Sequence, residues 1–409
     1  MADSKDAKQP HLASLVRAGD AQTEAEKIND FIFMAKDISN AYLVTTDAGD
    51  VLINAGFMGS AERNTKVLGP VRSGDLKYII LTQAHADHFG GVPAFKEPGT
   101  KIITQQRFTE TADFFDRLGP YLHRRSGKLW SGTIKGRTLT VPKIEPDITF
   151  DEHYQFELGG RRFEVIATPG GEALDACAVW MPEERVVFTG NLFGPVFMAV
   201  PNLCTMRGDK PRSAQRWLDS LDKIRNLEAD LLITGHGEPI ACTDKIRSNL
   251  DQMHAAMSYV LNATLDGMNE GKDVHTLMRE VQLPEELALG EFHGKVSWAV
   301  RTIWEEHSGW FHHDYTTSLY GVARSSVDID IAELAGGADK LADRAQIKLA
   351  NNTPLQAMHL LEIALGAEPK NPRCLALKKQ TLETLLEQSG GNNLSETMWL
   401  KSEIAATGL

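Results

Sequence analysis

The stretch TQAHADHFGG at residues 82–91 constrains this chain more than any other part of it. An apolar, strand-like run at 78–81 leads into it, and His85, Asp87 and His88 then follow close together. A turn at the end of a strand lets neighbouring side chains converge, which the alternation along a strand would prevent. Zinc binds imidazole nitrogen and carboxylate oxygen. We therefore expect a metal site here; the alternative is a solvated turn that contains histidines.

This turn resembles the metal-binding motif of the metallo-beta-lactamase superfamily, His-x-His-x-Asp-His followed by glycines, with Gln83 at the position of the first histidine. A second match lies at residues 168–173, Thr-Pro-Gly-Gly-Glu-Ala. It resembles the Pro-Gly-Thr-Glu-Ala pattern of the alkylsulfatase branch, in which the glutamate is a metal ligand. The resemblance therefore implies that Glu172 binds metal, whereas a glutamate in such a turn is otherwise more often exposed.

Two later apolar runs complete the series. The run at 186–190 ends in Asn191, where the superfamily commonly has an aspartate that bridges two metals. The run at 229–234 leads to His236, which resembles the superfamily's last ligand. The order of these motifs along the chain is more specific than any one of them.

The resemblance implies one intact metal position. Asp87, His88 and His236 would provide three protein ligands and leave a fourth position open, as in catalytic zinc sites. Water bound to such an ion ionises near neutral pH to a hydroxide nucleophile, and Asp87 could also orient that water.

A second position is weaker, because two of its expected ligands are amides. It would use His85, Glu172 and Gln83, with Asn191 as a candidate bridge, and neutral amide oxygens hold zinc less well than imidazole or carboxylate. Asn54 continues this trend, since the superfamily often has an aspartate there. Three outcomes stay open: a single-zinc enzyme, a two-metal enzyme with an exchangeable second ion, or a site too weak for chemistry.

Residues 202–208, Asn-Leu-Cys-Thr-Met-Arg-Gly, resemble the Asn-Leu-x-Thr-Leu-Arg-Gly stretch of alkylsulfatases, and Arg212 and Trp217 extend the match. In that branch the asparagine and arginine bind the sulfate group, so the resemblance implies this role for Asn202 and Arg207, and we add Arg212 as a substrate-binding candidate. A guanidinium presents a planar fork of donors to an oxyanion. The alternative is that Arg207 pairs with its neighbour Asp209.

The alternation of strand and helix signals over the first half predicts an α/β structure, with hairpins at 41–53 and 148–168 and a polar helix at 22–28. The resemblance implies an αββα metallo-beta-lactamase sandwich. From Lys245 onward the apolar residues recur at helical spacing. We predict a flexible arm at 1–20, a catalytic domain at 21–244 and an all-α domain at 245–409.

The helical part resembles the alkylsulfatase dimerisation domain, through Met-Asn-Glu-Gly at 268–271 and Ser-Gly-Trp-Phe at 308–311, and this implies a homodimer. The chain ends at Leu409 without the sterol-carrier-like domain that alkylsulfatases usually add, which argues against a long-chain detergent as substrate. His312, His313, Tyr315 and Tyr320 are candidates for lining the pocket, although adjacent histidines in a polar loop are more often exposed.

A net charge of -12 opposes general affinity for nucleic acid. No apolar run approaches the ~20 residues needed to span a bilayer, and the polar N-terminus lacks the apolar core of a signal peptide, so we expect a cytoplasmic protein. The four cysteines are scattered, without the spacing of a disulfide framework or a cysteine zinc site. The basic segment 124–142 is either a solvated face or a loop over the active site.

The sequence thus predicts a zinc-dependent hydrolase of an anionic or polar ester, most simply a sulfate ester, that acts on a small molecule through metal-bound hydroxide. Asp87, Arg207 and Asn202 are the expected catalytic residues. The alternatives are a metal-dependent hydrolase of another bond (a lactone, an amide or a carbon–halogen bond) and a catalytically silent dimeric binding protein.

Overall fold

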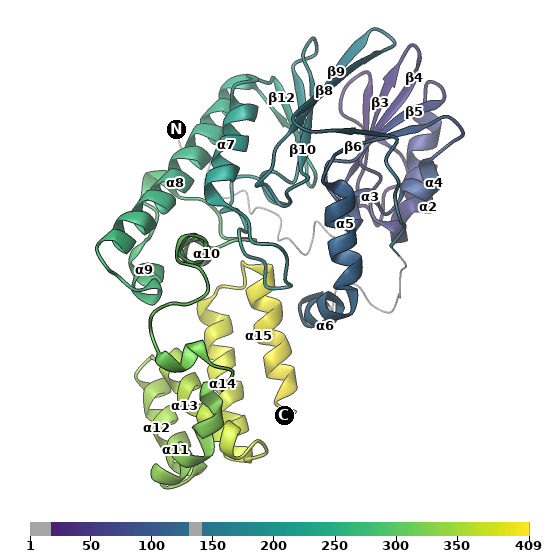
Figure 1. The fold of residues 1–409 in the computed structure, drawn as a ribbon. Coiled ribbons are helices and arrows are strands. Elements are labelled where there is room, and N and C mark those ends of the chain that lie inside the picture. The colour runs from purple at the N-terminus through teal and green to yellow at the C-terminus, as the bar shows by residue number, and fades with distance from the viewer. Residues whose placement is uncertain (1–17, 131–140, 409) are drawn as a thin grey trace, which may run out of the picture. The chain divides into compact units, whose positions relative to one another are not determined.

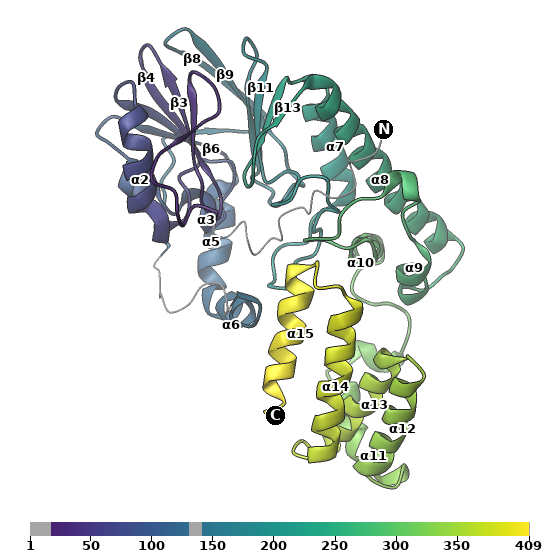
Figure 2. The same cartoon turned by 180° about the vertical axis from the view of Figure 1, so that it is seen from behind.

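The computed structural model describes residues 18–130 and 141–408. Two sheets face each other within them (Figures 1 and 2). The strands of the first sheet, in their order across it, are β1 (Glu26–Lys27), β2 (Ile32–Ala35), β3 (Ala41–Thr46), β4 (Gly49–Ile53), β5 (Leu76–Ile80), β6 (Lys101–Gln105) and β7 (Ile148–Phe150). Those of the second, in chain order, are β8 (His153–Leu158), β9 (Arg161–Ala167), β10 (Cys177–Met181), β11 (Val186–Gly190), β12 (Leu231–Thr234) and β13 (Ile240–Ala241).

Both sheets contain parallel strands, and the carboxyl ends of parallel neighbours lie at the same edge of their sheet. Strands β4 to β7 pair in parallel in the first sheet, and β11 pairs in parallel with β12 in the second. Apolar side chains from both sheets form one core between them, including Val51, Ile80, Val165, Phe188 and Ile233. This core fixes the sheets face to face, so the loops after β5 and β12 are held by buried strands.

Helices cover the outer faces of both sheets (Figure 1). The α-helices of the first half are α2 (Ala61–Leu68), α3 (Ala86–Phe89), α4 (Val92–Phe95), α5 (Phe108–Arg117), α6 (Gly119–Trp130) and α7 (Ala214–Arg225). The later ones are α8 (Thr243–Asn269), α9 (Val274–Glu280), α10 (Val296–Ser308), α11 (Asp328–Leu334), α12 (Ala338–Ala350), α13 (Pro354–Ala367), α14 (Pro372–Gln388) and α15 (Leu394–Ala406). Short 3-10 helices lie at Met58–Ser60, Gly69–Val71, Glu285–Leu287, Thr316–Leu319 and Arg324–Val327. No helix in the described part of the chain is long and apolar enough to cross a membrane.

Two local predictions were wrong. The predicted helix at 22–28 is a turn followed by β1, because the Gln22 amide bonds the backbone of Met34 (3.0 Å) and Lys36 (2.7 Å) and ties the segment to β2. The predicted hairpin at 148–168 includes a strand of the other sheet: β7 pairs with β6, and only β8 and β9 form the hairpin. A period of two in the sequence shows that a strand has two faces, but it does not show which sheet the strand joins.

The described residues form two compact units, 18–125 with 141–306, and 126–130 with 307–408. Residues 245–306 are mostly helical, as expected, but they pack on the second sheet: Met253 and Ile303 share a buried core with Trp217 and Leu232. In the second unit, α12, α13 and α14 meet through small buried side chains such as Ala342 and Ala357. All four cysteines are free. The predicted arm lies mostly outside the described residues, as does part of the basic segment, with Lys135 and Arg137.

Candidate metal centre

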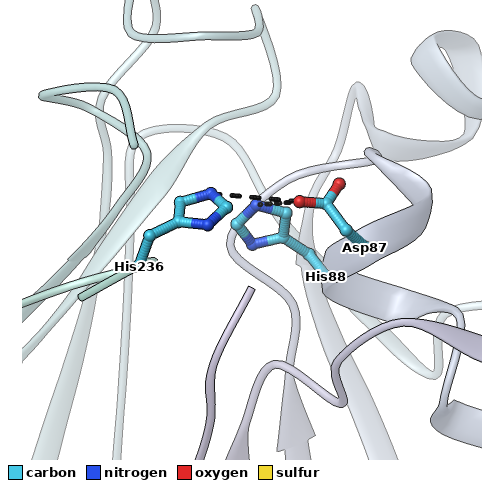
Figure 3. Close-up of side chains that lie close together, drawn as sticks. All are labelled: Asp87, His88 and His236. Carbon is cyan, nitrogen blue, oxygen red and sulfur yellow. Dashed lines mark ion pairs between the residues drawn. The ribbon is translucent and has the colours of Figure 1, made fainter. Parts of the chain in front are cut away.

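Asp87, His88 and His236 come from two separate strand ends. The chain leaves β5, reaches His85 in an extended conformation and enters the short helix α3, which carries Asp87 and His88. His236 follows the end of β12. The three side chains point toward one another (Figure 3), and their ligand atoms all lie within 4.8 Å of one another. Over residues 18–130 and 141–408, this is the one group of three or more His, Cys, Asp or Glu residues with such spacing.

Hydrogen bonds behind the two histidines determine which ring nitrogen faces the centre. Ser39 Oγ donates to the carbonyl of Gly235 (3.2 Å), so it is an acceptor for His88 Nδ1–H at 3.1 Å. His236 Nδ1–H donates to the carbonyl of Ile38. Both rings are thereby oriented with Nε2 inward, as partners behind metal-ligating histidines commonly do.

The donor atoms suit a metal ion. His88 Nε2 is buried and has no hydrogen-bond partner among the described residues, an arrangement that costs free energy unless a ligand satisfies the nitrogen. Burial lowers the pKa of His88 to about 4, so its ring is neutral. Burial opposes ionisation of Asp87, but the electrostatic interaction with the neighbouring imidazoles of His88 and His236 outweighs it and lowers the pKa of this carboxyl. Two imidazoles and a carboxylate match the preferences of zinc.

An amide supports the turn from behind. Asn54 Oδ1 accepts hydrogen bonds from the backbone N–H of Thr82 (3.0 Å) and from its hydroxyl (3.1 Å). Thr82 Oγ1 lies 3.3 Å from His88 Nδ1 and is a second partner for that nitrogen. Asn54 therefore tethers the end of β5 without adding a negative charge.

The residues of the expected second position also lie together. His85 Nδ1 is 2.6 Å from Gln83 Nε2 and 3.6 Å from Glu172 Oε2. Asn191 Nδ2 donates to the same glutamate oxygen at 3.0 Å. A Cβ at Gly235 would collide with Asn191 Oδ1 and lie 3.1 Å from His88 Cε1, so Asn191 lies between the two positions. The side-chain amides of Gln83 and Asn191 thus lie against His85 and Glu172.

Arg212, a substrate-binding candidate from the sequence, contacts carboxylates of the protein. Its Nη2 is 3.1 Å from Asp209 Oδ2, its Nη1 is 3.6 Å from Glu172 Oε1, and Nη1 donates to the carbonyl of Asn202 at 2.7 Å. The side chain is only 5% exposed. His85 Nε2 lies 3.5 Å from Asp209. Burial disfavours the His85 cation, but Asp209 and Glu172 outweigh this and raise the pKa of His85 to about 9.

The two residues expected to hold an oxyanion lie in the same region. Asn202 is buried, and its Oδ1 has no hydrogen-bond partner in the described chain. Arg207 is partly exposed, with Nη2 3.9 Å from Asp209 Oδ2, so the alternative pairing is present at long range. Arg125 of α6 donates to the carbonyls of Met206 (2.8 Å) and Arg207 (3.2 Å) and fixes the backbone of this segment.

Three contributors were not expected as site residues. Ser39 lies in the loop between β2 and β3, Asp209 was considered only as a partner of Arg207, and His293 Nε2 is 3.9 Å from Glu172 Oε1. Asp209 could have been noticed from its place between two arginines. The segments around Ser39 and His293 carry no motif. Their roles depend on contacts that exist only in the folded chain, so no signal for them is present in the sequence.

Two segments of the chain match known protein families. Residues 35–236 match the model of the metallo-beta-lactamase superfamily, so the chain carries a domain of that superfamily. Residues 273–402 match the alkyl sulfatase dimerisation family. The expected resemblance and fold class, a metallo-beta-lactamase sandwich followed by an alkylsulfatase-type helical domain, are thereby confirmed.

The chain is similar to several named sulfatases. It is 28% identical to a linear primary-alkylsulfatase of Pseudomonas sp. (strain ATCC 19151), over 73% of this chain and 61% of that protein. It is 26% identical to the alkyl/aryl-sulfatase BDS1 of Saccharomyces cerevisiae, over 88% of this chain and 60% of that protein. The solved structure of the stereoselective inverting sec-alkylsulfatase Pisa1 from Pseudomonas sp. superposes on 97% of this chain and 67% of its own, with a TM-score of 0.85 at 21% identity. The chain therefore spans about three-fifths of the length of these curated relatives.

Proposed function

We propose that this protein is a zinc-dependent hydrolase of sulfate esters. The observation that carries the proposal is the convergence of Asp87, His88 and His236, with the outer nitrogens of both histidines engaged by hydrogen bonds. A zinc ion held by these residues would supply Lewis acidity and a nucleophile at neutral pH. The similarity to alkylsulfatases over most of this chain supports the choice of bond.

The residues around the metal position have separate tasks in this proposal. Ser39 holds the His88 ring, and the ionised Asp87 carboxylate accepts a hydrogen bond from the attacking water and orients it. Arg207 and Asn202 bind the sulfate oxygens and offset the negative charge that builds up as the ester bond breaks. Arg125 keeps the Arg207 backbone in place through two carbonyls.

An anionic substrate explains the arrangement better than a neutral lactone or amide would. A partly exposed guanidinium and the side-chain NH2 group of the buried Asn202 are hydrogen-bond donors, and they are suited to a group that carries charge and several oxygens. The alternative of a catalytically silent binding protein predicts that the purified protein contains no metal. Metal content therefore distinguishes this alternative from both kinds of hydrolase.

Metal analysis followed by activity tests the proposal. Purified protein is expected to contain about one zinc per chain and to hydrolyse short alkyl or aryl sulfates in preference to lactones of similar size. His88→Ala is expected to lose both the metal and the activity. His153→Ala removes a histidine whose ion pair with Glu164 (3.4 Å) belongs to the second sheet, and it should change neither. Protein free of metal, or activity that His88→Ala retains, would refute the proposal.

We also propose that the second unit forms a homodimer, as the dimerisation family implies. Between residues 310 and 334 it exposes apolar side chains that a monomer would leave in water: Trp310 (74% exposed), Tyr320 (68%), Val322 (64%), Ile329 (57%) and Leu334 (89%). A second copy of the chain is the occupant that the dimerisation family indicates. A cytoplasmic location remains a prediction from the sequence.

A further inference from the structure

We infer that the guanidinium of Arg212 takes the place of a second metal ion, so that the protein holds one ion per chain. The inference rests on the proposed metal site at Asp87, His88 and His236, and concerns the position next to it. The superfamily resemblance implies two metal positions, and the residues of the second do not fit an ion.

The first argument is the position of a permanent cation. Arg212 lies between Glu172 (3.6 Å) and Asp209 (3.1 Å), the two carboxylates nearest to His85, and its side chain is 5% exposed. Guanidinium stays protonated at every pH that a protein experiences, so this charge cannot be lost to make room for a metal. Its Nη1 also donates to the Asn202 carbonyl, which holds the group in place.

The second argument is charge balance. Glu172 and Asp209 are each matched by one arginine, Arg212 and the more distant Arg207 at 3.9 Å. A divalent ion added to this buried cluster would leave two positive charges without a counter-ion, which is costly away from water. The first metal site has no such cation: in the described structure the ion pairs of Asp87 are with His88 and His236.

The third argument is the nature of the remaining donors. Gln83 and Asn191 stand where the superfamily has stronger ligands, and the oxygens they could offer an ion, Gln83 Oε1 and Asn191 Oδ1, are neutral amide oxygens, which hold zinc less well than imidazole or carboxylate. The N–H group of Asn191 instead donates to Glu172 and stabilises that carboxylate. Amides and arginine therefore perform together, by hydrogen bonds and charge, the stabilising role that a second ion has elsewhere.

The experiment combines restored ligands with removal of the cation, and it counts metal by elemental analysis after dialysis against zinc. The wild-type protein and Gln83→His should both hold one equivalent. Gln83→His combined with Arg212→Met should rise toward two. Gln83→His with Arg216→Met is the matched control, because Arg216 is an exposed arginine of α7, and it should stay at one.

The inference is overturned by two equivalents in Gln83→His alone, or by one equivalent in the folded Gln83→His/Arg212→Met protein. If the double variant unfolds without metal, recovery of its circular dichroism with two equivalents of zinc supports the inference, and recovery with one contradicts it. Wild-type protein with no ion would instead refute the proposed function, and wild-type protein with two would refute this inference alone.

Discussion

Replacing Ser39 by alanine should weaken zinc binding without unfolding the protein. The Ser39 hydroxyl joins the Gly235 carbonyl to His88 Nδ1, so its loss frees the imidazole to rotate and to change tautomer. Partners of this kind contribute about 10- to 100-fold to metal affinity. Thr82 Oγ1 remains 3.3 Å from the same nitrogen, which places the expected loss near the lower end, about tenfold or about 1.4 kcal/mol.

Competition with a chelating dye measures this loss directly. Ser258→Ala is a matched control, because Ser258 Oγ lies 3.4 Å from His254 Nδ1 on α8, a serine–histidine contact outside the metal centre, and zinc affinity should not change there. Ser39→Ala combined with Thr82→Val should lose clearly more than Ser39→Ala alone. An affinity within twofold of wild type in both Ser39 variants would show that the ring is held by packing and not by these hydroxyls.

Three further predictions follow from other contacts. Arg207→Lys should retain more sulfatase activity than Arg207→Ala but lose at least ~10-fold in kcat/KM, because a point charge replaces a planar fork; equal activity in Arg207→Ala would exclude the oxyanion role. The hydrogen bond from Arg72, opposed by burial, lowers the pKa of Glu97 to about 2. Ionised Glu97 therefore stabilises the fold fully above pH ~4.5, and this stabilisation is lost as the pH falls through ~2. Because the Glu97 side chain is 37% exposed and its charge is screened by water, Glu97→Gln should lower the free energy of unfolding in urea by about 1 kcal/mol at pH 7 and by less at pH 3. An equal loss at both pH values would contradict the role of this ion pair. Leu334→Asp should shift the mass in light scattering from dimer to monomer, whereas Leu355→Asp, at another exposed leucine, should not; a monomeric wild type would refute the dimer.

Local sequence was enough to predict the residues that follow buried strands. His88 and His236 each come after an apolar run, and such runs are reliable strand signals when glycine turns bound them. The face-to-face arrangement came from the family resemblance, because nothing local tells which strand end meets which. Ser39 could not be predicted for the same reason: its partner Gly235 is almost two hundred positions away in the chain.

Arg212 shows a different limit. Its motif predicts a residue that binds the substrate's anionic group, and in the structure its guanidinium contacts two anions of the protein itself, Glu172 and Asp209. A guanidinium binds a sulfate oxygen and a carboxylate oxygen through the same geometry, so residue type alone cannot separate a substrate contact from an internal ion pair. The ion pair becomes visible only in the fold, where the turn at 170–172 meets the segment at 209–212.

His85 and His88 demonstrate how the surroundings, and not the residue type, determine which histidine can hold an ion. The two lie three positions apart on one turn, and the N–H of His88 bonds the carbonyl of His85. Behind His88 is the Ser39 hydroxyl, itself bonded to the Gly235 carbonyl, which directs Nε2 toward Asp87, and burial keeps the ring neutral. Around His85 are the carboxylates of Glu172 and Asp209, and both of these already contact the buried guanidinium of Arg212. Adding back the missing histidine at position 83 changes a ligand but not the charge, so we expect the second position to remain without an ion until Arg212 is removed.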